Sequence, residues 1–485
     1  MQRRQFLKST IASSIALLAA GSLRAADLTA KNLISGQPIQ PFTPIALRNG
    51  EAELDIAPAQ TAIFKDGTPT NVWKYSSGDG QMFDVFEGDD LEITMNNQLP
   101  EATTVHWHGI NVPADQDGDG HQAFGAGTSR VAAFTVPQDS AGSYWFHPHP
   151  HGRTAFQVAQ GLAAPFIVRS KTDPIAALGI RDIPLFFTAP MLDDNAQIAP
   201  QSMSEQMNGR SGNVVLVNGQ YLPVLDAKNG ETLRLRLFNA SNARFLRLSF
   251  SETDMVQIGT DGGLLTSPLA PVSNILLAPA ERAEVLVRFE RTSKLIALSY
   301  EKGFMGGMGI TDRPAEDADV EIMSVQVSGD TIEPIEVPTT LRAIDPLGDA
   351  VVTRQFILSE NMQMSMAGGQ HSMSMEFMIN GQTFDMNRID FTAKQDDIEL
   401  WEIINQTDMD HPFHIHGHQF QIVSTIENGV ETPFPYLCWK DTINTKRGQT
   451  IRLKLKQNQL GKRMFHCHIL EHEDLGMMGQ YEVVT

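Results

Sequence analysis

Histidines in closely spaced pairs are the residues of this sequence best suited to chemistry. Eight of its 14 histidines form four His-x-His pairs. Side chains two residues apart on a β-strand project to the same face, so each pair can offer two imidazoles to one place. Eight converging imidazoles would suit a cluster of borderline-soft metal ions. Two pairs lie in the first part of the chain and two near its end: His106/His108, His147/His149, His414/His416 and His466/His468.

A second group of potential ligands surrounds Cys467. His472 follows five residues later, Met477 ten residues later, and His411 precedes the third histidine pair. Two histidines, one cysteine and a distant methionine are the ligands of blue-copper electron-transfer sites. Cys467 stands between the two histidines of the last pair, so on a strand it points away from both. An electron that reaches a metal on Cys467 would therefore have a short covalent path to the histidine cluster.

The chain contains only two cysteines, Cys438 and Cys467. A disulfide between them is one possibility, and metal binding by at least one of them is the other. The histidines on either side of Cys467 favour metal binding. In that case Cys438 is left as a free, buried thiol.

Three repeated segments define the elements that must position these ligands. Each combines an acidic turn, alternating apolar residues and a final asparagine, over residues 88–97, 230–239 and 396–405. Such alternation is typical of half-buried strands, and repeats of this length are whole domains. We therefore expect an all-β chain of three consecutive Greek-key β-sandwiches. The expected domains span residues 27–170, 171–335 and 350–485, with a linker over 336–349.

The N-terminus indicates export. Arg3 and Arg4 precede an apolar stretch, and small residues follow up to Ala26, so residues 1–26 resemble a twin-arginine signal peptide. The alternative is a chance arginine pair before a membrane anchor, but the stretch is shorter than the roughly 20 residues that a span needs. We expect a periplasmic monomer without stable membrane association. The net charge of −20 argues against nucleic acid as a partner and is compatible with cationic substrates.

Together these motifs resemble those of the multicopper oxidases, in the family's order and over nearly the whole exported chain. They lie at residues 106–109, 145–149, 411–417 and 466–477. The subgroup that they resemble is the bacterial three-domain cuprous oxidases and laccases, which consist of cupredoxin-like domains. The resemblance implies four copper ions, one of type 1, one of type 2 and two of type 3.

The resemblance also implies a ligand set for each kind of copper. The type 1 ligands would be His411, Cys467, His472 and Met477. The type 2 ligands would be His106 and His414. The type 3 ligands would be His108, His147, His149, His416, His466 and His468.

The implied activity is the oxidation of a substrate one electron at a time, coupled to the four-electron reduction of O2 to water. We expect electrons to enter through an exposed edge of His411 or His472 and to leave through Cys467. Oxygen reduction consumes protons, and the resemblance indicates Asp117 and Glu473 as the relay residues. The alternative for Asp117 is a solvated position in an acidic loop.

Methionines in the segment 362–378 bear on the substrate. Thioether sulfur favours Cu(I), whereas a flexible, gap-filling segment is the alternative explanation. Cuprous oxidases carry a Met-rich insert over the type 1 site, and here Met305 and Met308 form a second, smaller group. Thr407 stands where the family has an acidic residue. The candidate ligands for a substrate copper ion are Met362, Met364, Met366, Met373, Met375, Asp408, Met409 and Asp410.

Three hypotheses of function follow. The first is a cuprous oxidase of copper homeostasis, and the second is a laccase-like oxidase of phenols with an open type 1 pocket. The third is a copper-free cupredoxin-like structural protein of the cell envelope, which the complete ligand set disfavours. A copper nitrite reductase is disfavoured because its family lacks this set of histidine pairs. The remaining histidines are expected to have structural or supporting roles: His121, His151, His371 and His418.

Overall fold

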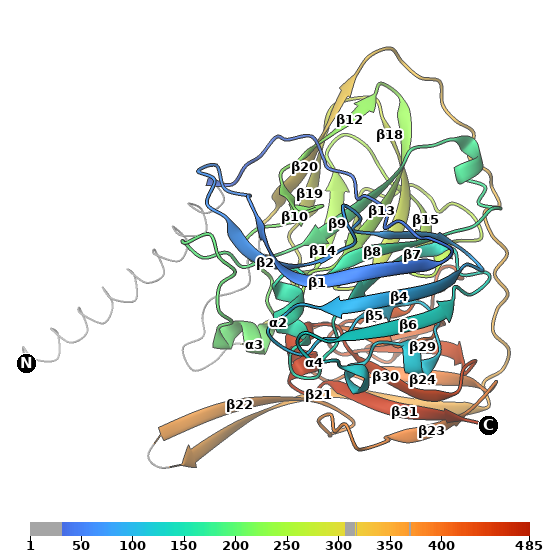
Figure 1. Cartoon of the computed structure of the whole chain (residues 1–485). Helices are drawn as coiled ribbons and strands as arrows, with labels where there is room; N and C mark the ends of the chain where they lie inside the picture. Colours follow the sequence, from blue (N-terminus) through green and yellow to red (C-terminus); the bar gives the residue numbers. More distant parts are fainter. Residues whose placement is uncertain (1–31, 306–315, 317, 368–369) are drawn as a thin grey trace, which may run out of the picture.

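The computed structural model describes residues 32–305, 316, 318–367 and 370–485, and for residues 363–374 it describes the backbone alone. Strands dominate it, and the helices are short (Figure 1). The strands form six sheets, two in each third of the chain. The expected fold class of three consecutive cupredoxin-like sandwiches is therefore confirmed, while the exact domain limits stay predictions. The expected signal peptide lies outside the described residues.

The first sandwich carries the first two histidine pairs. Its sheets have the strand orders β2-β1-β4-β6 and β3-β8-β7-β5, and Ile93 and Trp107 from the two sheets pack in one core. Its strands are β1 (Glu51–Thr61), β2 (Thr70–Ser76), β3 (Phe83–Phe86), β4 (Asp90–Asn97), β5 (His106–His108), β6 (Ser129–Thr135), β7 (Gly142–His147) and β8 (Ala164–Arg169). Its helical turns are η1 (Ala114–Gln116), η2 (Gly120–Gln122) and α2 (Thr154–Ala159).

The second sandwich carries none of the predicted copper ligands. Its sheets have the orders β11-β10-β9-β13-β18-β15-β16 and β12-β20-β19-β14-β17. Its strands are β9 (Asp182–Thr188), β10 (Leu216–Val217), β11 (Gln220–Tyr221), β12 (Val224–Lys228), β13 (Glu231–Asn239), β14 (Leu246–Phe250), β15 (Val256–Thr260), β16 (Gly263–Leu264), β17 (Ile275–Leu277), β18 (Arg282–Phe289), β19 (Ser293–Leu298) and β20 (Val320–Ser328). Its helical segments are η3 (Ala176–Leu178) and α3 (Met203–Asn208).

The third sandwich carries the other two pairs and Cys467. Its sheets have the orders β22-β21-β24-β29-β26-β27 and β23-β31-β30-β25-β28. Its strands are β21 (Val352–Ala367), β22 (Gln370–Ile379), β23 (Phe391–Lys394), β24 (Ile398–Asn405), β25 (His411–Ile415), β26 (Phe420–Glu427), β27 (Val430–Pro433), β28 (Thr442–Thr445), β29 (Gln449–Lys456), β30 (Gly461–Cys467) and β31 (Met478–Val484). Helix α4 (Leu470–Asp474) follows β30.

The asparagines that end the three repeated segments have one structural task. Asn97, Asn239 and Asn405 end β4, β13 and β24, and all three are buried. Each side-chain amide donates to a carbonyl group of the loop that follows its strand, which satisfies a backbone acceptor there. The Asn405 amide lies 2.8 Å from the carbonyl oxygen of Met409. It therefore fixes the loop that leads into His411.

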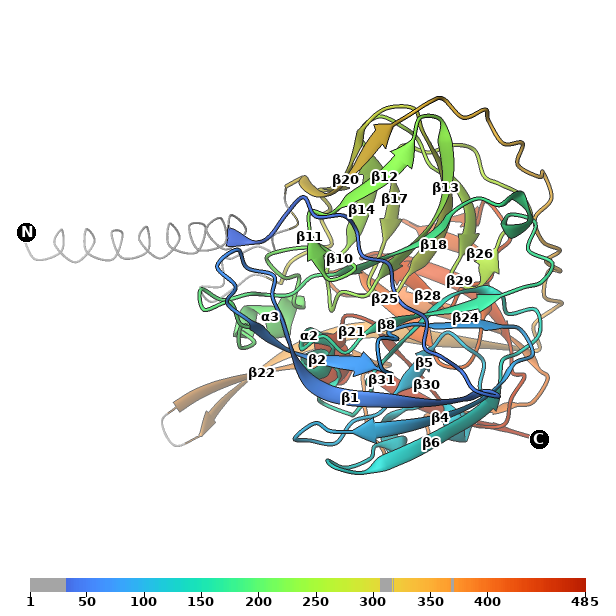
Figure 2. The same ribbon diagram turned by 45° about the horizontal axis from the view of Figure 1, so that its top comes forward.

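The first and third sandwiches lie side by side, blue to cyan against orange to red, and the second covers one end of both (Figures 1 and 2). Helices α2 and α4 contact each other across the boundary between the first and third sandwiches. The hairpin of β21 and β22 projects from the body of the protein in both views. Within the described residues, no helix has the length and apolar character to cross a membrane.

Candidate copper centres

Short strands with antiparallel partners bring the histidine pairs together. In the first sandwich, His106 of β5 lies opposite His147 of β7. In the third, His414 of β25 lies opposite His466 of β30. The residue between the first pair, Trp107, turns to the other face and is buried in the domain core. The alternation of side chains along a strand thus aims the histidines out of each sandwich.

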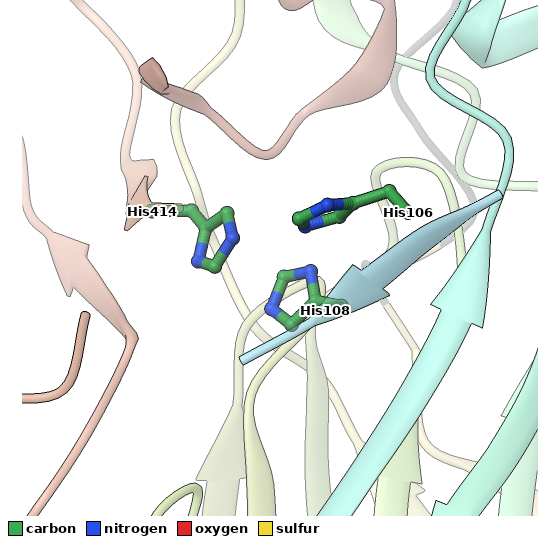
Figure 3. Close-up of side chains that lie close together, drawn as sticks. All are labelled: His106, His108 and His414. Atoms are coloured by element: carbon green, nitrogen blue, oxygen red, sulfur yellow. The ribbon is translucent and has the colours of Figure 1, made fainter. Parts of the chain in front are cut away.

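The eight histidines of the pairs meet in one cluster, and every one of them is fully buried. In Figure 3, His106 and His108 extend from β5 and face His414 across a small gap. The ligand nitrogens form three groups, each within 4.8 Å: His106, His108 and His414; His108, His147 and His468; His149, His416 and His466. Each group combines residues of the first and third sandwiches.

Hydrogen bonds through Nδ1 fix the orientation of most rings. Nδ1 of His106 lies 2.9 Å from the carbonyl oxygen of Asp117, and Nδ1 of His414 lies 2.8 Å from that of Asp441. The Nε2 atoms of both rings are buried without a partner in the described structure. Such bonds set the tautomer that leaves the other nitrogen free for a metal. Three more rings use Nδ1 in this way: His147 to the Pro148 carbonyl, His466 to the Cys467 carbonyl and His416 to the Asp117 carboxylate.

Burial keeps these imidazoles neutral, as metal binding requires. It lowers the pKa of His466 to about 3, and it lowers those of His149 and His416 well below the usual value, helped by neighbouring rings. The Nε2 atoms of His149 and His416 lie 3.2 Å and 3.0 Å from Nε2 of His466. Two nitrogens that share a tetrahedral metal at about 2.0 Å are roughly 3.3 Å apart. The spacing therefore fits a metal ion.

A separate group of ligands surrounds Cys467, which is fully buried. Nδ1 of His411 lies 3.3 Å from its sulfur and 3.4 Å from Nδ1 of His472. Met477 is buried in the same core cluster, and its carbonyl accepts from the Cys467 amide. Burial raises the pKa of the Cys467 thiol, so a thiolate there needs a metal ion to stabilise it. The donor set of two nitrogens and one thiolate fits copper.

The outer nitrogens of both histidines in this group are covered. Nε2 of His411 lies 2.8 Å from the Thr407 hydroxyl, and Nε2 of His472 lies 3.0 Å from the Met207 carbonyl on α3. Phe377 of β22 stacks on the His472 ring at 3.9 Å between centroids. Both histidines are fully buried, so the expectation of an exposed histidine edge is wrong.

The chain is similar to several known proteins. Three family models described as multicopper oxidase match residues 58–173, 189–303 and 355–485. The multicopper oxidase mco of Staphylococcus haemolyticus is 34% identical over 409 residues, which are 82% of this chain and 80% of that protein. A solved structure described as a multicopper oxidase from Campylobacter jejuni, a metallo-oxidase, is 36% identical with a TM-score of 0.85, over 93% of this chain and 96% of the other. The chain belongs to the multicopper oxidase family.

Membership of the multicopper oxidase family implies copper as the bound metal, O2 as the electron acceptor and a reducing substrate. A relative with a different name also matches along the whole chain. The cell division protein FtsP of Photorhabdus laumondii is 28% identical over 495 residues, which are 99% of this chain and 98% of that protein.

Two buried carboxyl groups lie against the histidine cluster of this multicopper oxidase. Asp117, the first predicted relay residue, is 1% exposed, and its Oδ2 lies 2.7 Å from Nδ1 of His416. It is therefore not a solvated loop residue. Glu473, the second, is also 1% exposed, and its Oε1 lies 3.4 Å from Nε2 of His149. Burial, with a contribution from the neighbouring Asp474, raises the pKa of Glu473 well above its usual value.

Two further residues at the cluster, Asp441 and Arg282, were missed in the sequence analysis. Asp441 is fully buried, and its Oδ1 lies 3.1 Å from Nε2 of His108. Arg282, from the second sandwich, donates to both carboxylate oxygens of Asp441. Neither residue belongs to a motif, since each reaches the site only through tertiary packing.

The predicted Met-rich segment forms the hairpin of β21 and β22. The strand register sets Met362 opposite Met375, and Met364 opposite Met373. Met375 is buried in the third core, and Met362 packs against it. Residue 366 lies opposite His371, and this outer part of the hairpin has only its backbone described.

The other three candidate substrate ligands lie in the loop before His411 and differ in their burial. Met409 is fully buried, and Asp408 is exposed. Asp410 is buried, and its carboxylate accepts from the Tyr300 hydroxyl at 2.6 Å and from the Arg447 amide at 3.0 Å. These bonds satisfy Asp410 within the protein, so the expectation that it binds a substrate ion finds no support in its geometry.

The remaining predicted positions lie outside the three histidine groups and the Cys467 group. His121 contacts Gln480, and His418 contacts the His416 carbonyl. The ring of His151 packs against Phe384, at 4.7 Å between centroids. Cys438 is a buried free thiol, as expected, and burial raises its pKa to about 12.

Proposed function

We propose that the protein is a cuprous oxidase, which couples the oxidation of four Cu(I) to four Cu(II) with the reduction of O2 and four protons to two waters. The observation that carries the proposal is the position of Cys467 in β30. Its sulfur belongs to one ligand group, with His411 and His472, while His466 and His468 on either side of it belong to the other groups. One strand thus joins an electron-accepting centre to a centre that can bind O2.

The ligand assignment is the one that the family resemblance implies, and these groups support it. Copper bound here would supply one-electron redox chemistry, and the residues that would hold it are buried. We assign the type 1 copper to His411, Cys467, His472 and Met477. We assign the type 2 copper to His106 and His414. We assign the type 3 pair to His108, His147, His149, His416, His466 and His468.

Glu360 supports Cu(I) as the substrate. Its Oε2 is buried and has no hydrogen-bond partner in the described part of the chain, and burial raises its pKa. Its Oε1 accepts a long bond of 3.4 Å from the Asp408 amide. An unpartnered carboxylate oxygen is costly to bury unless a cation joins it. Glu360 and Asp408 therefore form the acidic part of a cation site.

Soft ligands stand next to this carboxylate. Glu360 and Met362 are two residues apart on β21, so they share a face of the hairpin. On β22 their register partners are Phe377 and Met375. Phe377 stacks directly on His472, so an electron from a Cu(I) ion at Glu360 would cross one aromatic ring to reach a type 1 ligand.

The test compares Cu(I) and a simple phenol as reductants in oxygen-consumption assays. The variants are Glu360→Gln and a shortened hairpin in which residues 364–373 are replaced by Asn-Gly, which keeps the core residue Met375. We expect the KM for Cu(I) to rise at least about tenfold in Glu360→Gln, with phenol oxidation unchanged. The shortened hairpin should also lose Cu(I) oxidation.

Glu482→Gln is the matched control, since Glu482 is a partly buried strand glutamate of the same domain at the far end of β30 and β31, opposite Lys462. It should behave as the wild type does. Unchanged Cu(I) kinetics in both test variants, together with good phenol oxidation, would reject the cuprous-oxidase proposal and favour a laccase.

The laccase alternative needs an open type 1 pocket. Here Met207, Thr407 and Phe377 cover both type 1 histidines, which argues against direct contact with a phenol. The copper-free alternative is motivated by the similarity to FtsP. It predicts a purified protein without copper or blue colour, so metal analysis distinguishes it.

We also propose that the protein is exported to the periplasm by its twin-arginine signal, where it would remove Cu(I) and so serve copper homeostasis. Replacement of Arg3 and Arg4 by lysine should retain the protein in the cytoplasm. Unimpaired export of that variant would contradict this route.

A further inference from the structure

Arg282 of β18 reaches the histidine cluster from the second sandwich. It is 1% exposed. Its Nη1 and Nη2 donate to the two carboxylate oxygens of Asp441 at 2.6 Å and 2.5 Å, and its Nε donates to the Ser143 carbonyl on β7 at 2.7 Å. One side chain thus joins all three sandwiches beside the cluster.

Asp441 is a fully buried carboxylate surrounded by donors. Besides Arg282, it accepts from the Thr442 hydroxyl at 2.9 Å and from Nε2 of Gln419 at 3.0 Å. Nε2 of His108 lies 3.1 Å from its Oδ1. Both oxygens of Asp441 accept from the Arg282 guanidinium, and a carboxylate oxygen that accepts in this way can only accept from the ring nitrogen beside it. The proton of the neutral His108 ring therefore lies on Nε2.

This tautomer is the reverse of the one that the other oriented rings adopt. Five rings of the cluster donate through Nδ1 and leave Nε2 free: His106, His147, His414, His416 and His466. His108 instead has Nδ1 free, and this atom lies 3.4 Å from Nε2 of His147. The two free nitrogens thus face the same point.

We propose that Arg282 and Asp441 are positioning residues that hold His108 in the tautomer whose Nδ1 binds a type 3 copper. The second sandwich, which supplies no ligand, thereby sets the ligand geometry of the centre between the other two. The inference rests on the proposed type 3 site. Nδ1 of His414 donates to the Asp441 backbone carbonyl at 2.8 Å and lies 3.6 Å from its Oδ1. A change of the Asp441 side chain therefore removes the direct partner of His108 but leaves the main hydrogen bond of the type 2 ligand in place.

Asp441→Asn tests the pair in the intact, copper-loaded protein. An amide cannot satisfy Arg282 and His108 at once, because one of its two terminal groups is a donor. We expect an unchanged blue absorbance per chain, which reports the type 1 site. The type 3 copper should be bound about 10- to 100-fold more weakly, so that weaker chelators remove it. Copper content after dialysis against a graded chelator series, with the electron paramagnetic resonance of the remaining copper, measures this.

Two further variants keep the test decisive. Arg282→Lys, which loses the two-pronged contact but keeps the charge, should show the same selective loss in milder form, and it decides the question if Asp441→Asn does not fold. Arg236→Lys is the matched control: Arg236 is equally buried in the second sandwich and also reaches Ser143, at 2.9 Å, but it pairs with Glu284. Its copper should be retained as in the wild type.

Retention of type 3 copper in both Asp441→Asn and Arg282→Lys, at wild-type chelator resistance, would overturn the proposal. Equal loss in Arg236→Lys would also overturn it, by showing a general effect of domain docking. A wild-type protein that binds no copper would instead refute the proposed function, so the two failures are distinguishable.

Discussion

Oε2 of Glu473 lies 3.2 Å from Nδ1 of His466, although one residue belongs to helix α4 and the other to strand β30. The helix starts only three residues after the strand ends, so the chain turns back on its own ligand. Burial raises the pKa of Glu473 well above its usual value, so it favours the protonated form of the side chain. In this form Glu473 is a carboxylic acid in contact with the site that we assign to O2.

Glu473→Gln should therefore slow the oxygen half of the reaction. The amide keeps the shape of the side chain but cannot deliver a proton, and loss of a general acid costs about 100-fold or more. Rapid mixing of fully reduced protein with O2 measures this step. Reduction of the type 1 copper by substrate should be unchanged and serves as the internal control. Reoxidation at the wild-type rate would exclude Glu473 as a proton donor.

Asp117→Asn should affect both copper binding and oxygen reduction. The Asp117 carboxylate accepts from Nδ1 of His416 at 2.7 Å, and removal of such a partner weakens metal affinity or activity about 10- to 100-fold. Copper retention and reoxidation rate measure the two effects. Asp115→Asn, an exposed position in the same loop, should change neither. Equal results for the two variants would show that the Asp117 contact has no role.

The histidine cluster was predictable because its residues are spaced regularly over short stretches of the sequence. Alternation along a strand puts residues two apart on one face, so the four His-x-His pairs predicted the histidine cluster before any fold was known. The repeated asparagines predicted the repeated sandwich for a related reason, since each must satisfy the same loop carbonyls in each domain.

Residues that join the site only through tertiary packing were not predictable. Arg282 lies more than 100 residues from every ligand in sequence, and Glu360 looks like any polar residue at a strand edge. The group that covers Nε2 of His472 is the backbone carbonyl of Met207. A backbone contact of this kind leaves no pattern of side chains in the sequence. The expectation of an exposed ring edge failed for this reason, because burial depends on which distant segment packs on top.

Removal of copper should lower the thermal stability of the protein. His468 has neither ring nitrogen bonded within the described structure, and Nε2 of His106 and of His414 are also unpartnered, which is costly in a buried cluster. A metal that binds only the folded state stabilises it by about 4 kcal/mol at 1,000 times its Kd. Calorimetry of stripped and reloaded protein measures the difference. Identical unfolding midpoints would argue against copper at these nitrogens.

Lys302 provides a buried positive charge close to the type 1 ligands. Its carbonyl accepts from the amide of Asp410, the residue before His411, at 2.6 Å. Its ammonium group is buried and donates to Ser211 and to the Ala243 carbonyl, with Glu316 at 3.4 Å. After burial itself, the Lys302 charge is the next cause that lowers the pKa of His411. The Lys302 charge therefore acts electrostatically on the type 1 ligand His411.

Lys302→Met should consequently lower the reduction potential of the type 1 copper. Oxidation adds one positive charge to the site, and a buried cation opposes that charge, so its removal stabilises the oxidised state. A redox titration that follows the blue absorbance measures the potential. Lys294→Met removes an exposed lysine of the same domain and should leave the potential unchanged, because solvent screens its charge. A potential that stays constant or rises in Lys302→Met would contradict the electrostatic role.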